Sequence, residues 1–357
     1  MRASLLCLLL LGLLAGWVGL GASSARADAM SDSGAESMSD SGADAASDSG
    51  ADEFAAWMAA LQQEARTRGI SEATLATTLA TVKPRPAVLE LDRSQPRKPG
   101  DFCGYLEKRL TRTRIARGQR ELATHRDLLR RIVAQYGVPA RYLVALWGLE
   151  TNFGDYQGDH PLFDALVTLA RDPRRGDLFR QQIFAALEIV EAGHPPENMS
   201  ASWAGAMGHV QFMPTTYQRY AVDWDGDGRK DVWSSVPDAL ASAANFLRAL
   251  GWRSGETWGR EVHLPASLAS RSEALRGTRS LEDWRELGVR RIDGDPLPTG
   301  HLPGRIVLPR RTPTPAFLVY PNYKIFMSWN RSTFFSISVG TLADEIAGRS
   351  SLRACRG

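Results

Sequence analysis

The chain contains 357 residues, with 43 basic and 40 acidic side chains and a formal net charge of +3. This length is enough for one large domain or two packed domains, whose core needs no metal or disulfide to be stable. The basic residues are scattered and accompany no helix-turn-helix, zinc-finger or aromatic–basic RNA motif, so nucleic acid is not an expected partner.

The first element in the chain is a predicted signal peptide over residues 1–27. A short basic start precedes an apolar run from Leu5 to Leu20, and Ala25-Arg26-Ala27 has the pattern of a cleavage site. A retained membrane anchor is the alternative, but the run is shorter than the roughly 20 apolar residues that span a bilayer. We therefore expect an exported protein that begins at Asp28 after cleavage.

Residues 28–53 follow as a segment of low complexity. They contain three copies of Ser-Asp-Ser-Gly-Ala, starting at Ser31, Ser39 and Ser47, with acidic but no basic side chains. Such a composition has too little apolar surface to bury, and it predicts a disordered acidic linker. The remaining residues, 54–357, form one predicted globular domain whose excess of basic side chains exceeds that of the whole chain, which suits an anionic polymer.

Two cysteines, Cys103 and Cys355, lie in this domain. A disulfide persists in the oxidising compartments that exported proteins reach. Pairing depends on a Cα separation that the sequence does not provide, so a disulfide and two free thiols both stay open.

The apolar spacing from Phe54 to about Leu250 is mainly helical. One predicted helix ends at Gly137, and Pro139 then starts the next helix, which runs towards Glu150. Beyond Trp252 the pattern changes to short runs between proline and glycine turns. These predicted strands cover Glu261–Leu264, Arg305–Leu308 and Ala316–Tyr320. Because a helical pattern returns at Thr341–Ile346, we expect a small sheet-bearing insertion in a mainly α (α+β) domain.

Three segments, Leu146–Gly154, Ser202–Pro214 and Tyr320–Ser332, together resemble the lytic murein transglycosylase B family, over about residues 54–347. The resemblance implies a lysozyme-like helical core and a peptidoglycan lytic transglycosylase. Such an enzyme cleaves the β-1,4 bond between N-acetylmuramic acid and N-acetylglucosamine without hydrolysis and leaves a 1,6-anhydro end. Together with the predicted signal peptide, the resemblance leads us to expect a periplasmic protein of a Gram-negative bacterium that binds peptidoglycan glycan strands. A monomer, with the cell-wall synthesis or division machinery as a further partner, is the accompanying hypothesis.

Glu150 is the predicted catalytic residue. Its apolar neighbours Leu146, Trp147, Leu149 and Phe153 should raise its pKa, as a general acid requires near neutral pH. The resemblance implies that this single carboxylate first donates a proton to the leaving group and then takes one back as general base. A capping glutamate is the structural alternative. A second carboxylate at Asp155, Asp159 or Asp164 would instead indicate a hydrolytic muramidase, and a further alternative is a non-catalytic peptidoglycan-binding module.

The resemblance also places sugar-binding positions on this sequence. They fall on aromatic and polar residues: Tyr105, Ser202, Gln211, Phe246, Tyr323 and Trp329. Gln211 offers both a donor and an acceptor to an acetamido group. Phe246 and Trp329 stand where the family usually has tyrosine, so they keep an aromatic face while a hydrogen bond at each position is in doubt.

The segment from Asp223 to Asp231 matches the start of an EF-hand loop. It predicts a structural Ca²⁺ held by side chains and one backbone carbonyl, from Asp223, Asp225, Asp227, Arg229 (the carbonyl), Asp231 and Asp238. The twelfth loop position is Ser234 where a glutamate belongs, so either Asp238 closes a longer loop or the site is weak; a plain acidic turn is the alternative. No motif for an organic cofactor is present in the sequence.

Overall fold

The computed structural model describes residues 42–95, 100–269, 272–310, 315–349, 352, 353 and 355. The predicted signal peptide and residues 28–41 of the predicted linker lie outside the described residues. The chain divides into two compact units, one ending at Val82 and the other beginning at Lys83. No helix among the described residues combines the length and apolar character needed to cross a membrane.

The unit that ends at Val82 consists of the helices α1 (Gly42–Thr67) and α2 (Glu72–Thr77) and the short 3-10 helix η1 (Leu79–Thr81). Ser71 caps α2 by accepting a hydrogen bond from the backbone N–H of Thr74. Helix α1 includes residues 42–53, which the sequence analysis assigned to a disordered linker. Their several alanines have the highest helix propensity, which explains why this stretch continues the helix that follows it.

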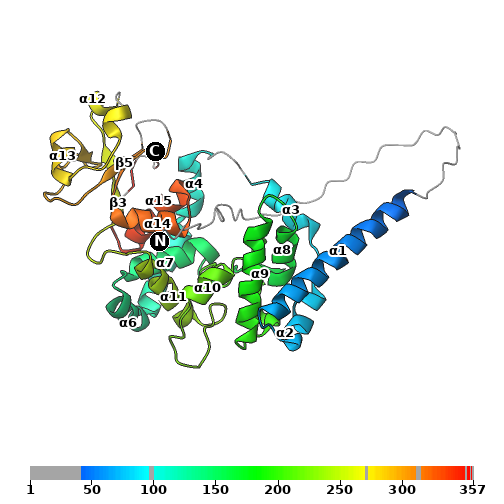
Figure 1. Cartoon of the computed structure of the whole chain (residues 1–357). Coiled ribbons are helices and arrows are strands. Elements are labelled where there is room, and N and C mark those ends of the chain that lie inside the picture. The colour runs from blue at the N-terminus through cyan, green and yellow to red at the C-terminus, as the bar shows by residue number, and fades with distance from the viewer. Residues whose placement is uncertain are drawn as a thin grey trace, which may run out of the picture. The chain divides into compact units, whose positions relative to one another are not determined.

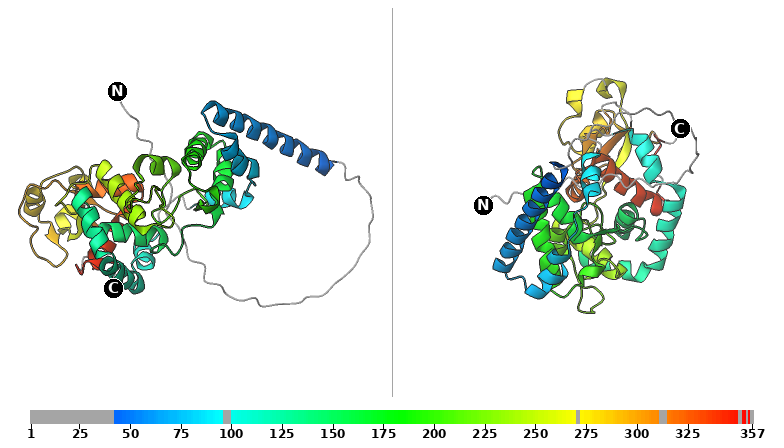
Figure 2. Two further views of the ribbon diagram at one scale, coloured as in Figure 1. Left: turned by 90° about the horizontal axis from the view of Figure 1, so that it is seen from below. Right: turned by 90° about the vertical axis from the view of Figure 1, so that its right-hand side faces the viewer.

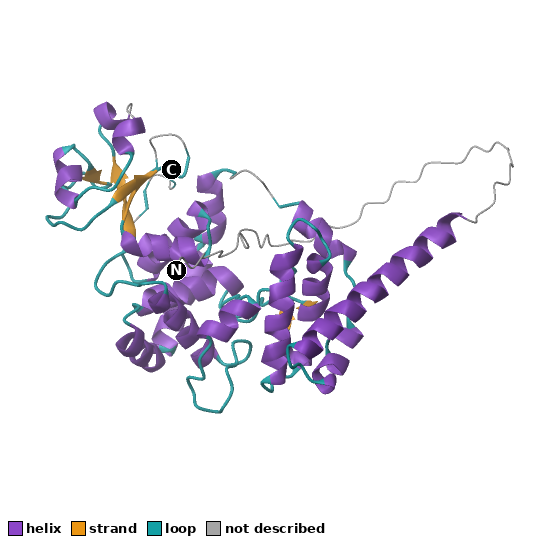
Figure 3. Ribbon diagram, viewed as in Figure 1, coloured by secondary structure: helices purple, strands orange, loops and turns teal. Residues whose placement is uncertain are grey.

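The unit that begins at Lys83 is mainly helical (Figures 1 and 3). Its helices are α3 (Pro86–Arg93), α4 (Phe102–Arg109), α5 (Arg112–Thr124), α6 (Arg126–Tyr136), α7 (Ala140–Thr151), α8 (Leu162–Ala170), α9 (Gly176–Glu191), η2 (Pro196–Asn198), α10 (Pro214–Tyr220), α11 (Val236–Ala249), α12 (Ala266–Ala269), η3 (Ser272–Leu275), α13 (Leu281–Glu286), α14 (Pro321–Trp329) and α15 (Thr333–Ile346). Helix α7 is buried from Tyr142 to Thr151, since it is apolar on nearly every side, and it packs against α15, α5 and α11.

Two antiparallel sheets complete the unit. The first pairs β1 (His160–Pro161) with β2 (Ser200–Ala201). The second has the order β4-β3-β6-β5, from β3 (Gly259–His263), β4 (Arg290–Arg291), β5 (Arg305–Val307) and β6 (Ala316–Val319). It lies beside α12 and α13 (Figure 2), and Trp284 and Leu318 are fully buried in the core that they share. The predicted insertion and all three of its predicted strands are confirmed; β4, only two residues long, was too short to predict.

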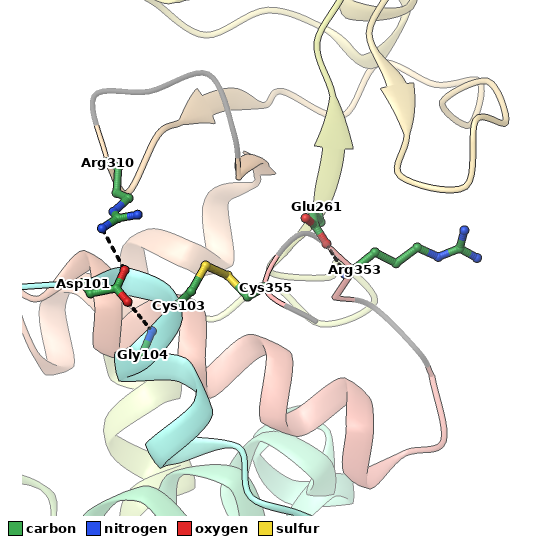
Figure 4. Close-up of a disulfide and its surroundings, with 7 residues drawn as sticks. All are labelled: Asp101, Cys103, Gly104, Glu261, Arg310, Arg353 and Cys355. Carbon is green, nitrogen blue, oxygen red and sulfur yellow. Dashed lines mark hydrogen bonds and ion pairs between the residues drawn. A yellow bond between two sulfur atoms is a disulfide. The ribbon is translucent and has the colours of Figure 1, made fainter. Parts of the chain in front are cut away.

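A disulfide joins Cys103 to Cys355, with a Cα–Cα distance of 5.1 Å (Figure 4). The sequence left a disulfide and two free thiols open, and the structure has the disulfide. Cys103 lies in the first turn of α4, where Asp101 caps the helix by accepting from the N–H of Gly104 at 3.0 Å. Closure of so long a loop constrains the unfolded chain, so the bond anchors the end of the chain to the start of α4.

Candidate active site

Glu150 lies in the last turn of α7, and its side chain is almost completely buried at 5% exposure. Its Oε1 accepts a hydrogen bond of 2.7 Å from the indole Nε1 of Trp329, at the end of α14. Burial raises the pKa of Glu150 to about 7, although the Trp329 bond and the positive charge of Arg109 oppose the rise. The carboxyl is therefore substantially protonated at neutral pH, as a general acid must be.

The chain leaves α7 in an unusual backbone conformation. Asn152 and Phe153 adopt left-handed φ angles of 52° and 62°, which are costly for residues other than glycine. The Thr151 hydroxyl holds this turn, because it donates to the carbonyl of His209 at 2.8 Å and accepts from the N–H of Gly154 at 3.0 Å. The position of Glu150 is thus fixed by the turn that follows it.

Asp155, Asp159 and Asp164, which follow Glu150 in the sequence, have surroundings different from those of Glu150. Arg117 forms an ion pair with Asp155, with a hydrogen bond of 2.9 Å from Nη2 to Oδ1, and lowers the pKa of that carboxyl. Asp164 accepts a hydrogen bond of 2.9 Å from Arg85. The side chain of Asp159 is 75% exposed. Two of these carboxylates are engaged by arginine and the third is solvated, so none resembles the isolated, buried carboxyl of Glu150.

The loop that carries Gln211 brings a buried amide into the same region. Gln211 has a left-handed φ of 52°, and its Nε2 donates to the carbonyls of Gln157 and Gly208, both at 3.0 Å. Its Oε1 is buried and has no hydrogen-bond partner among the described residues. Both amide hydrogens are therefore engaged, and the predicted donor and acceptor pair is reduced to an acceptor.

Ser202 and Gly208 shape this loop. The Ser202 hydroxyl accepts from the N–H of Ala206 at 3.1 Å and closes a tight turn. Gly208 has a φ of 66°, and a Cβ there would lie 2.3 Å from the carbonyl oxygen of Val232. Only glycine fits this position, so the close approach of two backbones supports the loop that presents Gln211.

An aromatic cluster lies beside Glu150. The Trp329 ring is 5.6 Å from the ring of Phe212 and 5.3 Å from that of Phe246, between centroids. Tyr220, which the sequence analysis did not select, stacks on Phe246 at 4.6 Å. Phe246 is only 5% exposed, so it supports the neighbouring rings more than it offers a face of its own.

Two predicted tyrosines occupy different settings. The Tyr105 hydroxyl is buried and has no hydrogen-bond partner among the residues that the structure describes. Burial raises its pKa, the Arg109 charge opposes the rise, and a charge on Glu150 adds to it, which places Tyr105 near the catalytic candidate. Tyr323 is 1% exposed and lies beneath the guanidinium of Arg305, 5.7 Å from the ring centroid, so it packs inside the protein.

Arg109 and His209 are site residues that the sequence analysis missed. Arg109 lies over the Tyr105 ring at 5.3 Å and donates to the Leu149 carbonyl at 3.5 Å. His209 Nδ1 accepts a hydrogen bond of 3.0 Å from the indole of Trp147, and burial lowers the pKa of His209, so the imidazole is neutral. His209 lies inside the predicted Ser202–Pro214 segment; Arg109 lies one helical turn after Tyr105.

The predicted calcium loop follows α10. The carboxylates of Asp223, Asp225 and Asp227 converge, with one oxygen of each within 4.8 Å of the others. Backbone N–H groups orient them: Asp223 accepts from Gly226 at 2.7 Å and from Gly228 at 2.9 Å. Three exposed carboxylates held this close repel one another, so the cluster suits a hard cation with oxygen ligands.

Asp231 and Asp238 are not part of this group of three. Asp238 is fully buried, and its two oxygens accept from the N–H groups of Trp224 at 2.7 Å and Asp231 at 2.8 Å. Asp231 Oδ1 accepts from the N–H groups of Trp233 and Ser234, both at 2.8 Å. Both side chains therefore hold the loop backbone in place.

Known proteins resemble this chain over most of its length. The model of a family described as Transglycosylase SLT domain matches residues 53–344. Membrane-bound lytic murein transglycosylase B of Escherichia coli (strain K12) is 29% identical over 262 residues, which are 70% of this chain and 68% of that protein.

Solved structures share the fold. SltB3 from Pseudomonas aeruginosa, in complex with NAG-anhNAM-pentapeptide, is 42% identical with a TM-score of 0.80, and the match covers 84% of this chain and 81% of that one. Escherichia coli Slt35 in complex with calcium is 28% identical with a TM-score of 0.69, over 82% and 92% of the two chains. These matches confirm the predicted fold class, a mainly helical lysozyme-like domain with small sheets.

Proposed function

The chain belongs to the Transglycosylase SLT domain family and is a peptidoglycan lytic transglycosylase, and on this premise we propose that Glu150 alone carries out its acid and base steps. The proposed reaction cleaves the β-1,4 bond between N-acetylmuramic acid and N-acetylglucosamine without water. It leaves a 1,6-anhydro end on the muramic acid. The observation that carries this proposal is the buried carboxyl of Glu150, whose pKa is raised to about 7.

In the first proposed step, Glu150 protonates the glycosidic oxygen as the bond from that oxygen to C1 of the muramic acid breaks. The 2-acetamido group of the same sugar stabilises the positive charge at C1. In the second step the C6 hydroxyl of that sugar bonds to C1, and its proton passes to Glu150. Glu150 ends the cycle protonated, and no atom of water enters the product.

Two orphaned polar atoms support sugar binding beside Glu150. The buried Oε1 of Gln211 lacks a donor, and the buried hydroxyl of Tyr105, which lies close to the guanidinium of Arg109, makes no hydrogen bond of good geometry within the described residues. A buried polar atom without a partner is costly, so both atoms are suited to hydrogen bonds with a ligand. Because Gln211 offers only an acceptor, we assign it to a donor of the sugar, such as the acetamido N–H or a hydroxyl.

A hydrolytic muramidase and a non-catalytic binding module are the competing functions. The ion pairs of Asp155 and Asp164 disfavour the muramidase, because they leave only the exposed Asp159 of the three candidate second carboxylates without an arginine partner. Purified sacculi should be digested with the protein, and the sugar ends analysed by mass spectrometry. The proposal predicts ends lighter by one water than hydrolytic ends. Hydrolytic ends would establish the muramidase, and no released fragments would indicate the binding module.

We propose that the acidic loop binds a structural Ca²⁺. The carboxylates of Asp223, Asp225 and Asp227 would hold it together with the backbone carbonyl of Arg229. Asp231 and Asp238 would support the loop. Slt35 is a relative whose structure is in complex with calcium, which supports this assignment. The ion would stabilise the fold and take no part in the reaction.

The expected location and ligand follow from the same premise. We propose that the protein acts in the periplasm of a Gram-negative bacterium, after export directed by residues 1–27. SltB3 has been crystallised with NAG-NAM-pentapeptide and with NAG-anhNAM-pentapeptide. We therefore propose that this chain binds glycan strands that carry stem peptides. Monomeric action beside the cell-wall synthesis or division machinery stays a prediction.

A further inference from the structure

Trp329 stands where the family usually has tyrosine, and it provides a hydrogen bond as well as an aromatic ring. The sequence left a hydrogen bond at this position in doubt, but the indole Nε1 donates to Oε1 of Glu150 at 2.7 Å. We propose that Trp329 is a positioning residue that holds Oε1 of Glu150, so that Oε2 alone gives the proton to the substrate and takes it back. This inference rests on the proposed function of Glu150.

The donor is held by its surroundings. Rings of Phe212 and Phe246 flank the indole at centroid distances of 5.6 and 5.3 Å, and Tyr220 stacks behind Phe246 at 4.6 Å. Packed aromatic rings have few alternative rotamers, so the N–H points to one place. Rotation of the Glu150 carboxyl would break this bond inside a buried site, where an unpaired donor is costly.

The chemistry of indole makes the two oxygens of Glu150 unequal. An indole N–H only donates, whereas a tyrosine hydroxyl both donates and accepts. Oε1 therefore stays an acceptor whether Glu150 is protonated or not, and the proton resides on Oε2. Trp329 cannot accept a proton from Glu150, so it does not divert the proton from the glycosidic oxygen.

The bond also favours one state of the reaction. A hydrogen bond to an ionised acceptor is roughly twice as strong as one between neutral groups. Trp329 therefore stabilises Glu150 most after the proton has left for the sugar, when the buried carboxylate accepts the Trp329 hydrogen bond and has Arg109 as a nearby cation. Trp329 thus opposes the effect of burial and keeps proton transfer from becoming too unfavourable.

Trp329→Phe tests the proposal, because it keeps the aromatic face and removes the donor. We expect kcat on soluble glycan fragments to fall roughly tenfold, with KM changed less than about threefold. The basic limb of the pH profile of kcat should move upward by about one pH unit, because the acid then holds its proton more firmly. A raised KM with the limb unmoved would show that Trp329 only stacks on a sugar, and would overturn the proposal.

Two further variants keep the result interpretable. Trp329→Tyr keeps an aromatic ring and restores a donor, so the basic limb of its pH profile should lie close to that of the unmodified protein. A limb that stays at the Trp329→Phe position would count against the proposal. Trp258→Phe is the matched control, since this buried indole donates to Asp344 Oδ2 at 3.0 Å, and Asp344 lies 3.7 Å from Arg141 at the opposite end of α7. It should lower the melting temperature and leave the limb in place.

The same assays separate this inference from the proposed function. If the unmodified protein produces no anhydro ends, the proposed reaction itself is wrong. If it produces them and Trp329→Phe leaves the limb unmoved in a folded protein, as checked by circular dichroism, only the positioning role is wrong. An equal shift of the limb in Trp258→Phe would also overturn that role, because the shift would then follow from the loss of any buried indole bond.

Discussion

The buried site around Glu150 and the acidic loop from Asp223 to Asp238 are both built around carboxylates, yet the surroundings of these carboxylates differ in opposite directions. At Glu150 a single carboxyl is buried, and its pKa rises to about 7. In the loop Asp223, Asp225 and Asp227 are exposed, and their oxygens converge within 4.8 Å. The Glu150 site therefore favours a bound proton, whereas the loop gathers negative charge that suits a cation, and the surroundings decide the difference.

His209 joins these two regions. Its N–H donates to the carbonyl of Val232 at 2.9 Å, and Val232 directly follows Asp231 of the acidic loop. Its own carbonyl accepts from Thr151, next to Glu150, at 2.8 Å. The acidic loop can thus influence the Glu150 site through the backbone, while the proposed proton transfers involve Glu150 alone.

The largest expected effect comes from Glu150→Gln, which keeps the volume and removes the titratable proton. General acid and base steps each contribute about 10² to 10⁴ in rate, and one residue is proposed for both, so turnover should fall by the upper part of that range or more. Release of anhydro-muropeptides from sacculi measures it, and Asp155→Asn, which should cost far less, is the control. A Glu150→Gln protein with more than about a tenth of normal activity contradicts the single-carboxylate mechanism.

A smaller effect is expected from Asp227→Ala in the acidic loop. Removal of one of three converging carboxylates should lower the melting temperature in calcium by several degrees and abolish most of the difference between calcium and chelator. Thermal unfolding in both conditions measures this, with Asp159→Ala as a control for the loss of an exposed aspartate. Identical melting curves of the unmodified protein with calcium and with chelator would identify the loop as a plain acidic turn.

The smallest effect concerns the link between the regions. Burial lowers the pKa of His209 and His194 below their ordinary value of 6.5. The unfolded chain therefore binds protons that the folded protein does not, so stability falls as pH decreases below about 6.5. His209→Gln should reduce the loss of melting temperature between pH 7.5 and 5.5 by a few degrees at most. An unchanged loss would mean that His209 does not contribute to acid sensitivity.

The sequence was sufficient where local pattern and residue chemistry coincide. Gly137 and Pro139 located the start of α7, and the apolar neighbours of Glu150 predicted its burial and the direction of its pKa. The strands of the insertion could be predicted because β-branched and aromatic runs lie between clear turns. Each of these features depends on residues close together in the chain.

Features that depend on distant residues could not be predicted. Trp329 and Glu150 are 179 residues apart, and no local pattern shows that an indole will replace a lost hydroxyl as donor. Arg109 reaches the Glu150 site from α4, where it donates to the carbonyl of Leu149 in α7. The helical residues 42–53 are a different case, since an acidic repeat there obscured the helix propensity of its alanines.

The most direct test of the central claim, that Glu150 is protonated near neutral pH because it is buried, compares the unfolding free energies of the unmodified protein and Glu150→Gln at pH 5 and pH 8. The pKa of Glu150 in the folded protein, about 7, lies above its ordinary value of 4.5, so the folded protein holds a proton that the unfolded chain releases, and stability falls as pH rises between these values. The Glu150→Gln protein does not lose stability in this way, because glutamine does not titrate. The stability of the Glu150→Gln protein relative to the unmodified protein should therefore increase by roughly 2 to 3 kcal/mol between pH 5 and pH 8. A difference that does not change with pH would contradict the claim, because it would mean that Glu150 titrates alike in the folded and unfolded chains.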